Sequence, residues 1–218
     1  MNLPSQTARE KMLAALRPSL GALALRGTIR SYPKNSVLIN EGELGDALYV
    51  LLQGRVKVYS NDAAGREITF NFVEPGDYFA EMCLDGGPRC ASVITEEPSV
   101  CSVVGPAALR QHMAEQPEFA QDLIFQVIRR ARAATQSARN MALLDVYGRV
   151  IVTLQGQPGH VRTDRPLTLT KITHQNIANR VGASREMVSR LLKDLEKGGY
   201  IELGVKRITL LKKLPARW

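Results

Sequence analysis

Histidine and cysteine are both scarce in this sequence, with three of each in 218 residues. The cysteines are odd in number and form neither a C-x-x-C pair nor the Cys/His spacing of a metal site, so we expect no disulfide framework and no structural metal. No Ser/His/Asp, Cys/His or paired-carboxylate set suggests catalysis, and we expect that the protein is not an enzyme. Long apolar runs and the charged-then-apolar layout of a secretory signal are also missing. The sequence therefore predicts a cytoplasmic protein that does not insert into a membrane.

Acidic residues are outnumbered near the C-terminus, which holds most of the positive charge. From Lys171 onward there are eleven Lys and Arg against four Asp and Glu, an excess of seven out of the net +8 of the chain. Such a concentration attracts DNA phosphates independently of base sequence. The length suffices for two modest domains with proper cores, and the charge indicates that the basic one comes last.

Residues 174–193 meet several independent requirements of a helix-turn-helix that reads DNA. Ala178 is small enough to let a second helix cross close by, and Gly182 can take the positive φ of a tight turn between helices. The apolar seam that joins two such helices is present at the right spacing, as Ile177, Val188 and Leu191. Ser184 is placed to cap the second helix. This register predicts double-stranded DNA as a partner.

The outer face of the second helix carries side chains that can read bases. They lie on its first two turns, the part of such a helix that enters a major groove, and they are Arg185, Glu186, Ser189 and Arg190. An Arg can make two hydrogen bonds to guanine, and a Glu can accept one from cytosine. The plainer interpretation is a solvated face on which Glu186 and Arg190 form an i,i+4 pair.

A wing is expected after the second helix. Two glycines at 198–199 should end the helix, and residues 200–203 and 207–211 read as two strands turning at 204–205. Lys206 and Arg207 lie near the tip of this hairpin. They can contact a DNA phosphate there, or simply keep an edge strand soluble.

Residues 27–104 run as short β-rich segments separated by turn signals, which is typical of an antiparallel barrel. The expected strands are 36–39, 47–52, 54–60, 67–73, 91–95 and 100–104. Segment 79–91 departs from this pattern and can form a short helix followed by a Gly-rich turn. There Arg89 could hold a phosphate and Glu81 a sugar hydroxyl. Alternatively, the segment is a plain β-turn in which these two side chains pair.

A long helix is expected from about Pro117 to Leu144. Small and apolar residues recur along it at alternating spacings of four and three, as Val127, Ala131, Ala134, Ala138 and Met141. This heptad seam would let two such helices approach closely, which favours a homodimer. The alternative is a helix laid on its own barrel.

This combination resembles the CRP/FNR superfamily of bacterial transcription regulators, whose catabolite activator is a cyclic-AMP receptor. The motifs that carry the resemblance are GDALYVLLQG at 45–54, PGD at 75–77 followed by FAE at 79–81, PR at 88–89, ALLDVYGR at 142–149 and GASREMVSR at 182–190. The resemblance covers nearly the whole chain. It implies an α+β multidomain fold: an N-terminal helix and β jelly-roll, cyclic-nucleotide-binding-like effector domain (1–116), a long dimerisation helix (117–144) and a C-terminal winged helix-turn-helix domain (145–218).

The resemblance also implies roles on DNA for individual residues. Arg185, Glu186 and Arg190 match the base-reading set of the catabolite-activator branch, which implies that a dimer binds a palindrome of TGTGA-like half-sites. The positions at which the family contacts the DNA backbone are occupied by His174, Gln175, Ser184 and Lys206. Segment 155–166 falls where family activators touch RNA polymerase, which is therefore an expected partner.

For the effector the correspondence is partial. Glu81, Arg89 and Arg130 match residues that bind cyclic AMP in the receptors of this family, but Ala80 replaces a Gly. Cys90 replaces a phosphate-binding Ser, and a thiol is a poorer donor than a hydroxyl. Ala134 replaces a Thr, while Thr135 stands in for the second hydroxyl. The expected effector-binding residues are Glu81, Met82, Arg89, Cys90, Arg130 and Thr135. Cyclic AMP is the first expected effector and cyclic di-GMP the second.

Other interpretations of the barrel stay open. Glu81 and Arg89 could be a structural pair in a regulator that needs no ligand, and Cys83 or Cys90 could sense oxidants if exposed. Haem sensing is unsupported, because all three histidines, His112, His160 and His174, lie outside the barrel. A different class of protein is a cyclic-nucleotide-binding module that acts through protein contacts.

Overall fold

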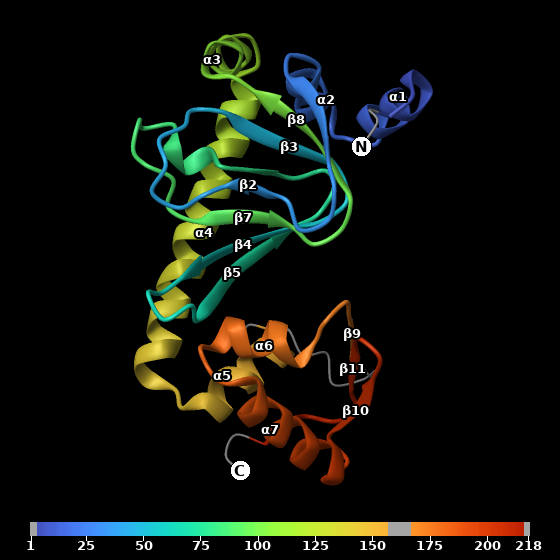
Figure 1. Cartoon of the computed structure of the whole chain (residues 1–218), viewed down its shortest axis with the longest axis vertical. Helices are drawn as coiled ribbons and strands as arrows, with labels where there is room; N and C mark the ends of the chain where they lie inside the picture. Colours follow the sequence, from blue (N-terminus) through green and yellow to red (C-terminus); the bar gives the residue numbers. More distant parts are fainter. Residues whose placement is uncertain (1–3, 157–166, 216–218) are drawn as a thin grey trace. The chain divides into compact units, whose positions relative to one another are not determined.

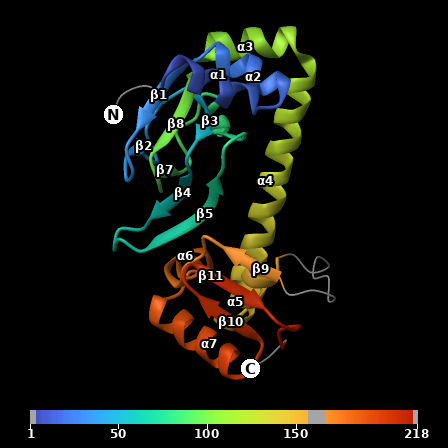
Figure 2. The ribbon, with the colours of Figure 1, turned by 90° about the vertical axis from the view of Figure 1, so that its right-hand side faces the viewer.

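The structure, a computed structural model, describes residues 4–156 and 167–215. Two compact units make up the chain: Met1–Ser60 with Phe70–Ala131, and Asn61–Thr69 with Arg132–Trp218. The long helix α4 (Pro117–Leu143) contributes to both, because the division falls within it. The ribbon is drawn in Figures 1 and 2. The boundaries 1–116, 117–144 and 145–218 stay predictions.

The first unit is built around two four-stranded sheets, which confirms the predicted β jelly roll. One sheet has the order β1 (Thr28–Tyr32), β8 (Ser99–Val104), β3 (Leu48–Gln53) and β6 (Tyr78–Phe79). The other has the order β2 (Val37–Ile39), β7 (Ser92–Thr95), β4 (Val56–Asn61) and β5 (Glu67–Val73). Paired strands run antiparallel, with Thr28 opposite Val103 and Leu48 opposite Val104.

Strand β3 shows how alternation in the sequence builds two cores. Its side chains point in turn to opposite faces of the sheet. Leu48 and Val50 join a cluster with Phe119 of α4, whereas Leu51 joins a cluster inside the barrel with Phe79. All of these side chains are buried, so the strand is apolar on both faces.

Helices cover one end of the first unit (Figure 2). They are α1 (Gln6–Ala14), α2 (Pro18–Leu25) and α3 (Pro106–Glu115), together with the start of α4. Helices α2 and α3 each begin with a proline, whose missing N–H would be unpaired in a first turn in any case. No helix in the described ranges combines the length and the apolar character needed to cross a membrane.

The sequence found six of these strands and missed two. Each of the six expected segments contains a strand, with shifts of one or two residues at the ends. Strand β1 was missed because TIRSY has no clear alternation, and β6 because it has only two residues. The expected strand at 54–60 begins at Val56 because Gly54 lies outside it at φ 90°. A Cβ on Gly54 would lie 2.3 Å from Ser99 Oγ, so only glycine fits.

The second unit contains the winged helix-turn-helix. Its elements after α4 are α5 (Val146–Gln155), β9 (Leu167–Thr170), α6 (His174–Val181), α7 (Arg185–Lys197), β10 (Ile201–Gly204) and β11 (Arg207–Leu210). The strands form one antiparallel sheet in the order β10-β11-β9. Strand β9 was not predicted, since the sequence suggested only a two-stranded wing. The turn of the wing is at Val205 and Lys206, one residue later than expected, because Gly204 is paired with Arg207 in the sheet.

The expected heptad seam on α4 is exposed in the single chain. All five of its residues are exposed, with Val127 at 40% and Met141 at 37% of their full accessibility. The side chains that α4 buries are Phe119, Leu123 and Gln126, near its start. The helix therefore lies on its own barrel by those residues and not by the seam. The alternative of a helix laid on its own barrel is thus correct for the start of α4, and pairing of two copies along the seam stays a prediction.

Candidate functional site

The helix-turn-helix is built as the sequence predicts. Gly182 ends α6 at φ 64°, and the Ser184 hydroxyl caps α7 by accepting from the backbone N–H of Met187 at 3.2 Å. The inner face of α7, with Val188 and Leu192, is fully buried. Since that face is fixed, the opposite face of its first turns must point outward.

Three of the four expected base-reading side chains are exposed on α7: Arg185, Glu186 and Arg190. Hydrogen bonds from the backbone N–H of Glu186 and from Ser184 lower the pKa of the Glu186 carboxyl. It is therefore an ionised acceptor at neutral pH, as bonding to a base amino group requires. No ion pair joins Glu186 to Arg190 among the residues that the structure describes, so both side chains are available.

The fourth residue, Ser189, is half-buried and has a partner. Its Oγ lies 2.8 Å from Nδ1 of His174, the first residue of α6. Burial, and then the positive charges of Arg185 and Lys193, lower the pKa of His174. The imidazole is therefore neutral in the free protein near pH 7. The sequence predicts separate roles for these two residues, whereas in the structure their side chains are in contact.

A cavity of about 480 Å³ opens between the start of α6, the start of α7 and the wing. Its polar lining comes from Thr173, His174, Gln175, Arg185, Lys206 and Arg207. The backbone N–H of Ile172 donates to the carbonyl of Lys206 at 3.2 Å, which ties the tip of the wing to the segment before α6. The cationic side chains of Arg185, Lys206 and Arg207 and several hydrogen-bond donors thus line one concave surface, which suits an anion such as a phosphate.

This cavity collects most of the expected backbone-contacting residues. His174, Gln175 and Lys206 line it, whereas Ser184 does not and serves as the cap of α7. Thr173 lines it too and was missed; its side chain caps α6 in a capping box with Asn176. A threonine directly before a helix was the available signal.

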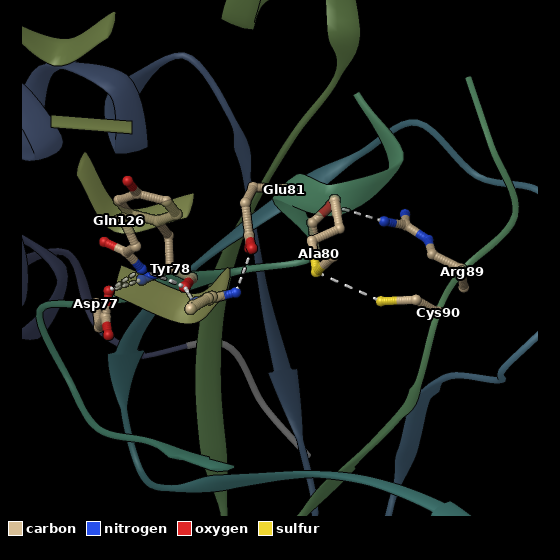
Figure 3. Close-up of polar contacts among 9 residues, drawn as sticks. Asp77, Tyr78, Ala80, Glu81, Arg89, Cys90 and Gln126 are labelled. Atoms are coloured by element: carbon tan, nitrogen blue, oxygen red, sulfur yellow. Dashed lines mark hydrogen bonds and ion pairs between the residues drawn. The ribbon is translucent and has the colours of Figure 1, made fainter. Parts of the chain in front are cut away.

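In the first unit, segment 79–90 holds four of the six expected effector-binding residues, and Figure 3 labels three of them, Glu81, Arg89 and Cys90. Glu81 begins the short 3₁₀ helix η1 (Glu81–Cys83) and is 2% exposed. Its Oε1 forms an ion pair with Nη1 of Arg130 on α4, and Nη2 of Arg130 donates to the carbonyl of Tyr78 at 2.9 Å. The second oxygen, Oε2, is buried and has no hydrogen-bond partner among the described residues. A buried carboxylate oxygen without a donor is costly unless a ligand supplies one.

Arg89 is also buried, and its guanidinium is held by the backbone. Nη1 donates to the carbonyl of Ala80 at 3.0 Å and Nη2 to that of Ala47 at 2.9 Å. A Cβ on Gly45 would lie 3.0 Å from Nη2, so this glycine makes room for the side chain. Residues of the GDALYVLLQG motif thus position Arg89.

The remaining residues that we expect to bind the effector lie less close together. Cys90 is exposed, and its Sγ lies 3.6 Å from Sδ of Met82. Thr135 is exposed on α4 beyond Ala131, in the second unit. The side chain of Cys83 lies outside the described part. The structure therefore groups Glu81, Arg130, Arg89, Met82 and Cys90, and leaves Thr135 a prediction.

Comparison with known proteins identifies both units. Residues 29–116 match the cyclic nucleotide-binding domain and residues 148–214 the Crp-like helix-turn-helix domain. The cAMP-activated global transcriptional regulator CRP of Pasteurella multocida is 33% identical over 84% of this chain and 89% of its own length. The CRP-like cAMP-activated global transcriptional regulator of Mycobacterium tuberculosis is 31% identical over 93% of each chain. The chain belongs to the CRP/FNR superfamily.

A solved structure extends the match to the whole fold. The c-di-GMP responsive global regulator CLP of Xanthomonas campestris has a TM-score of 0.73 and 23% identity, covering 88% of this chain and 97% of its own. The protein is thus a CRP/FNR-type transcription regulator with a cyclic-nucleotide-binding domain and a helix-turn-helix domain. Regulators of this family bind DNA and act as dimers.

In this CRP/FNR regulator, Ala80 holds a conformation that favours glycine, with φ 72° and ψ 19°. The left-handed region costs an L-residue roughly 1–2 kcal/mol. We expect Ala80→Gly to leave the free energy of unfolding within about 0.5 kcal/mol of the wild type, because the relieved strain offsets the extra freedom of the unfolded chain. Urea denaturation measures this.

The matched control for Ala80→Gly is Ala133→Gly, at an exposed position in the middle of α4. This change should cost about 1 kcal/mol, since the residue already has helical geometry. Equal losses in the two variants would contradict the strain at Ala80.

The Cys90 thiol of this regulator is not activated. Desolvation, and then the charges of Glu81 and Glu41, raise its pKa above the ordinary value of 9.0. In a Cys83→Ser background we expect alkylation of Cys90 by iodoacetamide to be slow at neutral pH and to reach half its maximal rate above pH 9, because the thiolate is the nucleophile. Mass spectrometry after timed quenching measures the rate.

Cys101 is the internal control, because it is buried and burial raises its pKa to about 12. It should stay unlabelled while the protein is folded. Rapid labelling of Cys90 near pH 7 would favour the redox-sensing interpretation instead.

Proposed function

We propose that this regulator binds, as a homodimer, a palindrome of TGTGA-like half-sites, with Arg185, Glu186 and Arg190 reading bases and Ser189 beside them. The observation that carries the proposal is the cationic cavity next to these side chains. A phosphate placed there by His174, Gln175 and Lys206 would fix α7 in the groove, and base contacts would then set the specificity.

The exposed seam on α4 supports the dimer. Its small residues allow close approach of a second copy, and Ile124, Phe125 and Ile128 add exposed apolar surface beside it. Exposed apolar side chains gathered along one helix favour an interface. Two copies joined along α4 would present two α7 helices to two half-sites.

For the effector domain we propose a cyclic nucleotide, with cyclic AMP first and cyclic di-GMP second. The buried, unpartnered Oε2 of Glu81 can accept a bond from a sugar hydroxyl, so this residue fits such a ligand. Arg89 fits a phosphate less readily, because it already donates to two carbonyls. Relatives named for both cyclic AMP and c-di-GMP support the class of ligand.

A ligand-independent regulator is the second candidate. It is favoured by the ion pair of Glu81 with Arg130 and by the backbone contacts of Arg89, since the chain itself supplies most partners of both side chains. RNA polymerase is a further proposed partner. The segment expected to touch it, 155–166, lies almost entirely outside the described residues.

The test is binding of a labelled TGTGA-N6-TCACA duplex at one moderate salt concentration, with no nucleotide, with cyclic AMP and with cyclic di-GMP. A duplex with both half-sites scrambled is the control for non-specific attraction. Tight binding only with one nucleotide supports the effector proposal, and tight binding without any supports the second candidate. Equal binding to both duplexes overturns the proposed half-site, and failure to select any DNA from a randomised pool favours a module that acts through protein contacts.

A further inference from the structure

The protonation state of His174 decides how many hydrogen bonds the pair of His174 and Ser189 can donate to other groups. A neutral imidazole carries one N–H and the serine one O–H, and one of these two hydrogens is used in the 2.8 Å bond between them. Whichever tautomer is present, one hydrogen is left to donate elsewhere. When the imidazole is protonated, three hydrogens are present and two remain for other acceptors.

The position of this pair makes the additional donor relevant to DNA. His174 lines the cationic cavity together with Arg185, Lys206 and Arg207, and Ser189 lies among the exposed base-reading residues of α7. DNA offers mainly acceptors at such a place, the phosphate oxygens and the acceptor atoms of base edges. We propose that DNA binding is coupled to uptake of one proton by His174 in each protomer, so that this histidine and Ser189 together donate two hydrogen bonds to the DNA. The inference rests on the proposed DNA-binding function.

The charges around His174 give the direction of the effect. In the free protein Arg185 and Lys193 of α7 oppose the imidazolium, with Glu196 of the same helix acting in the other direction. From the wing, Lys206 and Arg207 face the same cavity. A DNA phosphate bound there would neutralise this positive potential and favour the imidazolium.

The sign of the pH dependence follows from this. The free protein holds the pKa of His174 below its ordinary value of 6.5, while bound phosphate would raise the pKa of the same group. The complex then binds more protons than the free protein wherever the pH lies between the two values. Affinity must therefore increase as the pH falls toward and through 6.5, by no more than about tenfold per pH unit for each protomer.

The experiment is fluorescence anisotropy with the labelled TGTGA-N6-TCACA duplex at constant ionic strength, from about pH 8 to about pH 6. Wild-type protein should bind roughly three- to tenfold more tightly at the acid end. His174→Gln, which cannot take up the proton, should bind with nearly the same affinity throughout. Ser189→Ala keeps the titrating group, so it should retain part of the pH dependence while binding more weakly at each pH.

A second measurement does not depend on affinity. The C2–H resonance of His174, assigned by its loss in His174→Gln, should titrate at a higher pH in the presence of the duplex than without it. Wild type and His174→Gln with the same pH dependence, or a His174 resonance that DNA leaves unchanged, would overturn the inference. Absence of specific binding at every pH would instead overturn the proposed function, so the two failures are distinguishable.

Discussion

Arg130→Met should lower the free energy of unfolding by about 3 kcal/mol, the largest loss that we expect from a single exposed or half-buried side chain in the first unit. Glu81, its partner, is 2% exposed, and removing one member of such a pair leaves an uncompensated buried charge. Breaking a buried pair costs about 3–5 kcal/mol, and the 28% exposure of the Arg130 side chain places this case at the lower end. Urea denaturation at fixed protein concentration and neutral pH measures the loss.

Two further variants separate burial of charge from loss of packing. The double variant Glu81→Gln with Arg130→Met removes both charges and should recover at least half of the loss. Asp122→Asn breaks the pair between Arg17 and Asp122, whose side chains are 54% and 44% exposed, and should cost less than about 1 kcal/mol. If Arg130→Met were no more costly than Asp122→Asn, the pair at Glu81 would not be the buried contact that the structure describes.

Arg185→Ala should weaken specific DNA binding by roughly 1–3 kcal/mol and relax the base preference at one position of each half-site. Arg185 is exposed at the start of α7, where a bidentate bond to guanine is possible, and it also lines the cavity. Competition with a series of duplexes that carry single base changes measures both effects. We expect the change that is most costly to the wild type to become nearly neutral in the variant.

Lys206→Ala is the control for loss of charge alone. Its side chain lines the same cavity from the wing, so the variant should bind all duplexes more weakly by a similar factor and reduce the salt slope by about one. The assignment of base reading to Arg185 would be wrong if its alanine variant behaved in this way instead.

Much of the DNA-binding unit could be predicted because its constraints are local. Ala178, Gly182 and Ser184 each satisfy a steric or hydrogen-bonding requirement within a few residues of chain, and φ at Gly182 and the cap at Ser184 are as expected. Strand β9 could not be found in this way. Among the described residues its strand partner is β11, some forty residues later, and the apolar/polar alternation of its sequence, LTLT, is only four residues long.

The effector site shows the opposite case. Glu81 and Arg89 were identified from the Gly-rich segment itself and Arg130 by resemblance, but their partners depend on contacts between residues distant in sequence. Glu81 and Arg130 are 49 residues apart, and Arg89 reaches a carbonyl 42 residues away. No periodicity of the sequence specifies such pairs. The left-handed backbone at Ala80 could not be read from alanine itself, and the glycine that the family carries at this position was the available signal.

The exposed seam on α4 and the proposed base-reading face of α7 lie on different elements, and this separation has a genetic consequence. A subunit that carries Arg185→Ala keeps its seam, so it should still pair with wild-type subunits and produce mixed dimers with one functional half. In a cell that expresses both copies, such an allele should be dominant negative. An allele that places a charge on the seam, such as Ala134→Glu, would remove its own product from the pool of dimers and should be recessive.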